Sequence, residues 1–168
     1  VGSGTKNIAD IEEIHIVGNK SENDPPDLHC HCDESAMLLA FSERVHRIDP
    51  DIISGWNVVD FDLTVLQKRF RSLGLTFNLG RSNDSSWYQE GKTWGRSRMV
   101  IYGRQVIDTL HLIRSTVGRY DDYRLETVSQ KILGRGKRLQ VSTEVEDIMP
   151  ERILELFRNN RLEFCDYC

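Results

Sequence analysis

Length, composition and charge exclude several classes of protein. A chain of 168 residues is long enough for one domain with a substantial core, and 39% apolar with 29% charged residues is the composition of an ordinary globular protein. Its apolar runs fall short of the ~20 residues that span a bilayer, and its start lacks a basic-then-apolar signal, so we expect a cytoplasmic protein with no membrane partner. Four cysteines without paired spacing fit that reducing compartment.

The net charge of −4 conceals an uneven distribution of charge. Residues 1–62 hold 13 acids and 4 bases, whereas residues 92–138 hold 11 bases and 4 acids. A basic segment of this kind could bring a phosphodiester to an acidic metal site. The alternative is a solvated basic surface without a ligand.

Two strands and a helix are predicted before residue 48. Residues 13–18 and 28–32 alternate apolar and polar side chains, which is typical of strands. Asp33 can cap a helix that reaches about Arg47. The apolar positions of this helix follow helical spacing: Met37, Leu38, Phe41 and Val45.

The run His29-Cys30-His31-Cys32 contains four residues of metal-ligating type. In a strand the two histidines point to one face and the two cysteines to the other, so one ion cannot easily collect all four. We therefore expect Cys30 and Cys32 to be small core residues instead of zinc ligands.

The segment from Asp49 to Leu63 combines a short apolar strand, a Gly-Trp-Asn turn and the start of an amphipathic helix. The helix is predicted over 61–73 with Gly74 ending it and Asp60 capping it. Its expected buried positions are Val65, Leu66, the stem of Arg69, Phe70 and Leu73. Asp62 then lies on the first turn, held rigidly yet facing solvent, which suits a carboxylate that binds a divalent metal.

Residues 80–97 read as a long polar loop that carries Trp87, Tyr88 and Trp94 near several bases. These aromatic side chains could stack on single-stranded DNA, or the loop could pack on its own aromatics. Residues 98–107 are predicted to form a hairpin that turns near Gly103. Asp108 is expected to cap a short helix over 109–115, a role that we favour over one beside a metal site.

Two further helices are predicted, over 123–133 and from about Pro150 to the C-terminus, the first stopped by the glycines that follow it. Strands that alternate with helices indicate an α/β fold, in which the expected hairpin makes part of the sheet antiparallel.

The pattern Asn57-x-x-x-Phe61-Asp62 resembles the second exonuclease motif of family B DNA polymerases. The wider run DPDIISGWNVVDFDLTVLQK is similar to the bacterial, polymerase II-like members of that family. Further segments look like the same family: Gly80-Arg81, the run 103–108, the run 125–128 and the run 133–137. The resemblance implies a ribonuclease-H-like fold, a mixed sheet flanked by helices, with residues 1–168 forming a single, partial 3′→5′ exonuclease domain.

The resemblance also implies a function. Such domains proofread by hydrolysing the 3′-terminal phosphodiester of single-stranded or frayed DNA with two Mg²⁺ or Mn²⁺ ions. Asp62 would be a metal ligand, and Tyr167 would position the attacking water. Asn57 and Phe61 would contact the DNA, although Asn57 could instead tie the turn together. The other implied partners are the remaining domains of the parent polymerase.

Two motifs of the family are incomplete in this sequence. Asp10-Ile11-Glu12 is superficially like the first motif, but Glu13 replaces its threonine, and we expect the true motif upstream of Val1. The aspartate of the third motif would lie four residues after Tyr167, beyond the last residue. We therefore expect a piece truncated at both ends and nearly inactive by itself. The alternatives are a non-catalytic, exonuclease-like domain that binds DNA or scaffolds a polymerase, and a free-standing nuclease.

Overall fold

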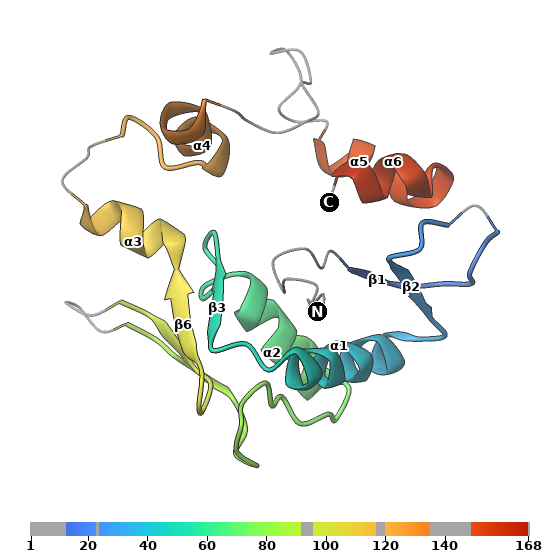
Figure 1. Cartoon of the computed structure of the whole chain (residues 1–168), viewed down its shortest axis with the longest axis horizontal. Helices are drawn as coiled ribbons and strands as arrows, with labels where there is room; N and C mark the ends of the chain where they lie inside the picture. Colours follow the sequence, from blue (N-terminus) through green and yellow to red (C-terminus); the bar gives the residue numbers. More distant parts are fainter. Residues whose placement is uncertain (1–12, 23, 92–95, 117–119, 135–148, 168) are drawn as a thin grey trace, which may run out of the picture. The chain divides into compact units, whose positions relative to one another are not determined.

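The computed structural model describes residues 13–22, 24–91, 96–116, 120–134 and 149–167 (Figure 1). The chain divides into two compact units, one made of residues 1–37 and 136–168 and the other of residues 38–135. Helix α1 (Glu34–Ile48) begins in the first unit and ends in the second. None of the helices in the described ranges is long and apolar enough to cross a membrane.

The first unit contains the parallel strands β1 (Ile14–Val17) and β2 (Leu28–His31) and the helices α5 (Met149–Asn159) and α6 (Arg161–Tyr167). Both strands were predicted from their alternation. The single C-terminal helix that we predicted is instead two helices. The break lies at Asn160, whose side-chain oxygen accepts a hydrogen bond from the backbone N–H of Glu163 at 3.3 Å and so starts a new helix.

The predicted cap of α1 is confirmed, because Asp33 Oδ1 accepts a hydrogen bond from the backbone N–H of Ala36 at 2.8 Å. The pairing of β1 with β2 sets His15 opposite His29. The imidazole of His15 stacks on His29 and on His31, with ring centroids 5.0 and 5.1 Å apart. The cysteines do not form the expected core: Cys30 is half-buried and Cys32 is exposed, because β2 ends at His31 and Cys32 already lies outside the strand.

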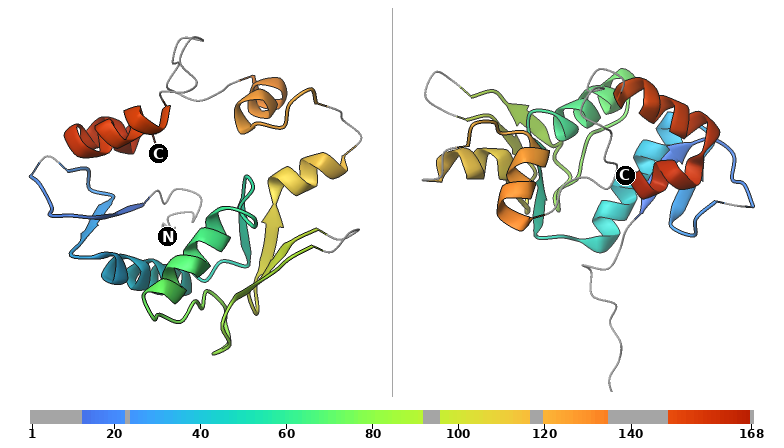
Figure 2. Two further views of the ribbon diagram at one scale, coloured as in Figure 1. Left: turned by 180° about the vertical axis from the view of Figure 1, so that it is seen from behind. Right: turned by 90° about the horizontal axis from the view of Figure 1, so that it is seen from above.

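The second unit holds the remaining strands and helices (Figure 2). They are β3 (Ile52–Gly55), α2 (Asp62–Ser72), β4 (Trp87–Gln89), β5 (Arg98–Val100), β6 (Gln105–Asp108), α3 (Thr109–Ser115) and α4 (Leu125–Leu133). Strand β6 runs directly into α3, because the last residue of the strand, Asp108, is also the N-cap of the helix.

The pairing of these strands differs from the predicted hairpin. β5 pairs antiparallel with β4, and β4 lies inside the region predicted to be a loop. β6 pairs in parallel with β3. Gly103 does turn the chain between β5 and β6, with φ of 80°. Helices and both kinds of strand pairing occur, as predicted for an α/β protein, but the strands described form three two-stranded sheets.

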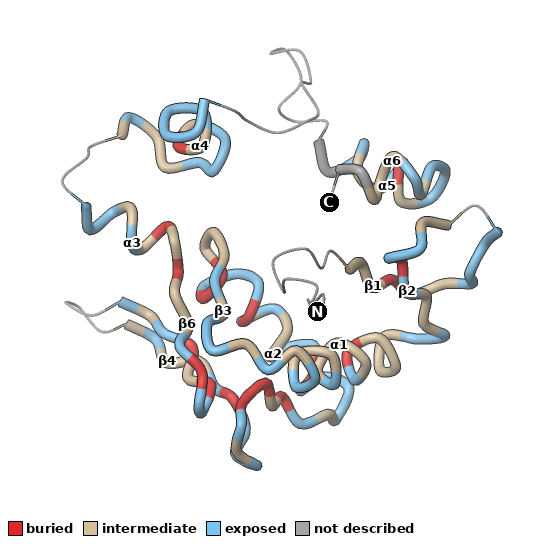
Figure 3. Tube along the Cα trace, in the orientation of Figure 1, coloured by how far each residue is buried: buried red, intermediate tan, exposed pale blue. Residues whose placement is uncertain are grey.

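The core of the second unit gathers around α2 and the segment that follows it (Figure 3). Phe70 and Leu79 are the largest fully buried side chains, and the Phe70 and Phe77 rings lie 5.3 Å apart. The predicted buried face of α2 was partly wrong. Leu63 and Phe70 are buried, whereas Val65 and Leu73 are exposed. Leu63 and Phe70 are seven residues apart and share one helical face, which Val65 does not.

Candidate functional site

The turn between β3 and α2 is closed by backbone hydrogen bonds. The N–H of Phe61 donates to the carbonyl of Asn57 at 3.0 Å, and the N–H of Leu63 donates to Val58 at 2.9 Å. Asn57 adopts φ of 57°, in the left-handed region that asparagine tolerates better than most residues. This conformation gives Asn57 a structural role in the turn, and its contact with DNA stays a prediction.

Asp62 is the first residue of α2 and is exposed, as predicted from the sequence. Phe61, which precedes it, is 61% exposed, so the side chains of Phe61 and Asp62 both face solvent. The N-terminal end of a helix favours a negative charge, because the free backbone N–H groups point toward it. Asp62 therefore presents its carboxylate to solvent at the start of α2, the position predicted from the sequence.

Asp60 does not cap α2, contrary to the prediction, and the helix begins without a side-chain cap. Its carboxylate lies 3.2 Å from Nε2 of His111 and accepts a hydrogen bond from the hydroxyl of Tyr88 at 2.9 Å. The side chain of Asp60 therefore contacts α3 and β4 instead of its own helix. A hydrogen bond with Ser97 lowers the pKa of Tyr88, but the bond to Asp60 and burial outweigh it and hold the pKa above its ordinary value.

Asp108 caps α3, as predicted, and makes a second connection that the sequence did not reveal. Its Oδ1 accepts from the N–H groups of Leu110 at 3.0 Å and His111 at 3.3 Å, and its Oδ2 accepts from the N–H of Val59 at 3.0 Å. Next to it, the hydroxyl of Thr109 donates to the carbonyl of Gly55 at 2.7 Å. The start of α3 is thus bonded to the turn that leads to Asp62.

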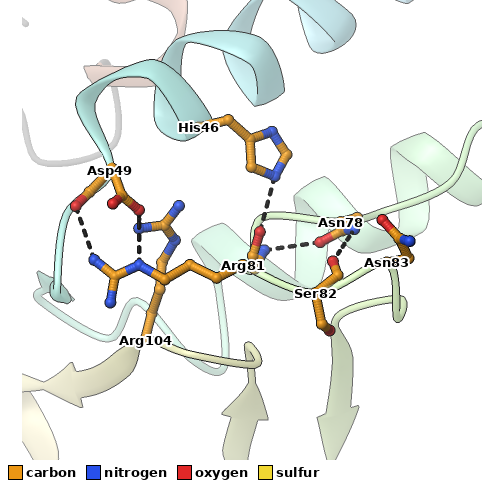
Figure 4. Close-up of a pocket in the computed structure, with 8 residues that line it drawn as sticks. His46, Asp49, Asn78, Arg81, Ser82, Asn83 and Arg104 are labelled. Carbon is orange, nitrogen blue, oxygen red and sulfur yellow. Dashed lines mark hydrogen bonds and ion pairs between the residues drawn. The ribbon is translucent and has the colours of Figure 1, made fainter.

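A pocket of about 340 Å³ lies where the chain enters β3 (Figure 4). Asp49 lies between two guanidinium groups: its Oδ1 accepts from Arg81 at 2.7 Å and from Arg104 at 2.8 Å. These bonds, with Arg81 first, hold the pKa of Asp49 below its ordinary value. The other lining residues are His46, Asn78, Gly80, Ser82 and Asn83. Every charged side chain of the pocket has an ionic partner, so we interpret the cluster as a structural tie.

The other residues singled out from the sequence lie away from the turn before α2 or outside the described ranges. Tyr167 is the last residue of α6, in the first unit, and its side chain is outside the described part, as are Asp10, Glu12 and Trp94. Trp87 lies on β4 and is 40% exposed. His111 was not predicted as part of the site, and Tyr88 was predicted only as an aromatic side chain that could stack on DNA. Their contacts with Asp60 join residues far apart in the chain, so local sequence patterns did not indicate them.

The described residues do not form a metal site. Among them, no three His, Cys, Asp or Glu side chains are grouped so that they could hold an ion. A hard divalent cation needs several oxygen ligands, and Asp62 is an exposed carboxylate of the type that could supply one. The residues described here therefore do not by themselves form a two-metal centre.

Comparison with known proteins defines the family. Residues 4–128 match the family described as DNA polymerase family B, exonuclease domain. The chain belongs to this family. It is 37% identical over 108 residues to DNA polymerase II of Escherichia coli (strain K12), covering 64% of this chain and 14% of that protein.

Archaeal relatives match over a longer part of the chain. A DNA polymerase of Thermococcus aggregans is 30% identical over 140 residues, which is 83% of this chain and 8% of the relative. A DNA polymerase of Pyrococcus glycovorans is 32% identical over 139 residues, which is 83% of this chain and 17% of the relative. The chain thus spans less than a fifth of the length of these three relatives.

Proposed function

We propose that this chain is the proofreading 3′→5′ exonuclease domain of a polymerase II-like family B DNA polymerase, located in the cytoplasm. Its reaction is hydrolysis of the 3′-terminal phosphodiester of single-stranded or frayed DNA, with release of a nucleoside monophosphate. The observation that carries the proposal is the exposed carboxylate of Asp62 at the start of α2, within the segment that matches the family.

The site residues have separate roles in this proposal. Asp62 is one ligand of the Mg²⁺ or Mn²⁺ ions that activate water and stabilise the leaving oxygen in this class of reaction. Asn57 and Phe61, in the turn that leads to Asp62, contact the terminal nucleotides, and Tyr167 positions the attacking water. We propose a ribonuclease-H-like arrangement for residues 1–168 as one partial domain, with its other metal ligands among acids that the structure does not describe or in the rest of the polymerase.

The test uses the full-length product of the gene that contains this sequence. A 5′-labelled single-stranded oligonucleotide is incubated with it in Mg²⁺ or Mn²⁺. Stepwise shortening from the 3′ end, lost in Asp62→Asn, would support the exonuclease. A folded protein that binds the oligonucleotide without shortening it would instead favour the alternative, a non-catalytic domain that binds DNA or scaffolds the polymerase.

A further inference from the structure

The start of α3 is bonded to the turn before α2 at two successive residues of that turn. At the first, the carboxylate of Asp108, which is 6% exposed, accepts the N–H of Val59 while it caps α3. At the second, Nε2 of His111 lies 3.2 Å from the carboxylate of Asp60. The His111 side chain is only 18% exposed, so this contact is screened less than a surface pair.

These contacts bear on Asp62 through the backbone. Asp62 is exposed, so the place of its carboxylate depends on the backbone beneath it. That backbone is the turn in which Leu63 bonds to Val58 and Phe61 bonds to Asn57. Val59 and Asp60 lie inside these two hydrogen-bonded loops. A shift of either residue therefore changes the direction from which Asp62 enters the helix.

We propose that Asp108 and His111 are positioning residues of the exonuclease reaction, which set the orientation of Asp62 by holding Val59 and Asp60. This inference rests on the proposed function. Groups that orient a metal ligand without touching the metal typically change activity by about 10–100-fold when they are replaced. A helix cap that served stability alone would change the free energy of unfolding and leave the catalytic rate of the folded protein unaltered.

The variants separate these two roles. The Asp108 carboxylate accepts from three backbone N–H groups through two oxygens. Asp108→Asn leaves one acceptor oxygen, and its amide NH₂ then faces at least one of these N–H groups, donor against donor. His111→Leu removes the ring nitrogen that lies 3.2 Å from the Asp60 carboxylate, whereas His111→Gln keeps an N–H group on a side chain of similar reach. Asp33→Asn is the matched control, because Asp33 caps α1 through Ala36 and belongs to another part of the chain.

The measurement is exonuclease kcat and KM on a labelled single strand, made with the full-length product of the gene. We expect kcat to fall about 10–100-fold in Asp108→Asn and about tenfold in His111→Leu, with KM for DNA changed by less than about twofold. His111→Gln should recover most of the rate, and Asp33→Asn should leave kcat unchanged. Amide hydrogen exchange should show loss of protection at Val59 in Asp108→Asn.

Several results would overturn the inference. One is an unchanged kcat in both Asp108→Asn and His111→Leu. Another is a loss in His111→Leu that His111→Gln does not recover, or an equal loss in Asp33→Asn. If Asp108→Asn fails to fold, the two His111 variants decide the question. An unsubstituted protein without exonuclease activity would overturn the proposed function as well, which distinguishes the two failures.

Discussion

The side chain of Arg104 is 1% exposed, yet its Nη1 lies 2.8 Å from Oδ1 of Asp49, whose side chain is 56% exposed. Arg104 also donates to the carbonyls of Leu79 at 2.6 Å and Pro50 at 2.5 Å. A buried guanidinium therefore joins the segment after α2 to the residues that lead into β3. Asp49 itself has φ of 51°, a conformation that needs support from its surroundings.

Replacing this guanidinium should destabilise the second unit. Arg104→Met keeps the length of the side chain but leaves the carbonyls of Leu79 and Pro50 without their donor, so we expect the free energy of unfolding to fall by roughly 2–3 kcal/mol. Urea denaturation measures this change. Arg81→Met is the control: Arg81 also binds Asp49 but is 37% exposed, so its loss should be smaller. Equal losses of unfolding free energy in the two variants would show that burial of the guanidinium does not determine how much it stabilises the fold.

The ion pairs of Asp49 predict how the stability of the protein depends on pH. The bonds from Arg81 and then Arg104 hold the pKa of Asp49 below 3.8 in the folded state, so the unfolded chain binds the proton more readily. The stabilisation is complete above about pH 5 and is lost as the pH falls through the lowered pKa. Wild type should therefore exceed Asp49→Asn in stability at neutral pH, and the two should converge in acid. Denaturation curves recorded from neutral to acidic pH measure the difference in stability between the two proteins. A difference that grew in acid would contradict a lowered pKa for Asp49.

Gly80 should not tolerate a side chain. A Cβ there would lie 2.7 Å from the carbonyl oxygen of Tyr102 and 3.1 Å from its nitrogen, and both are backbone atoms. We expect Gly80→Ala to lower the free energy of unfolding by about 1–3 kcal/mol. Gly74→Ala is the comparison, because Gly74 has φ of 69° with nothing within 4 Å, and its cost should be the left-handed strain of about 1–2 kcal/mol. Melting curves of the two variants separate steric overlap from strain, and a Gly80→Ala protein as stable as wild type would contradict the contact with Tyr102.

Asp62→Ala should abolish exonuclease activity with little change in stability. The side chain is exposed, so its removal should change the free energy of unfolding by less than about 0.5 kcal/mol. The check is 3′ shortening of labelled DNA together with a denaturation curve. Asp121→Ala removes another exposed carboxylate from the same unit and should keep full activity. Retained activity in Asp62→Ala would remove Asp62 from the site.

Binding of single-stranded DNA should weaken as salt rises. The basic segment 92–138 holds 11 bases against 4 acids, and each contact with a phosphate contributes a slope of about −0.7 to log K against log salt. Arg98 is exposed and so available to DNA, whereas Arg104 is buried. Fluorescence anisotropy should show a shallower slope, by about 0.7, in Arg98→Gln. Binding that is independent of salt would exclude a phosphate contact.

The elements that depend on local interactions were predictable from the sequence. Alternation predicted β1 and β2, and the caps at Asp33 and Asp108 were confirmed by their hydrogen bonds. Gly74 and Gly134 end α2 and α4 with φ of 69° and 67°. Asp62 at the exposed start of a helix also followed from the sequence. A helix cap, a helix stop signal and a periodic pattern each depend on residues close together in the chain, so they can be predicted from the sequence.

The pairing of strands and the contacts around the turn needed the tertiary structure. The sequence predicted a hairpin between β5 and β6, but β6 pairs in parallel with β3, which sets Gly55 beside Asp108. This pairing brings the start of α3 to the turn and so directs Asp60 toward His111 instead of toward its own helix. Which strands pair depends on which buried faces meet when the chain packs. The paired residues of β3 and β6 are about 50 positions apart in the sequence, so local propensity cannot predict their pairing.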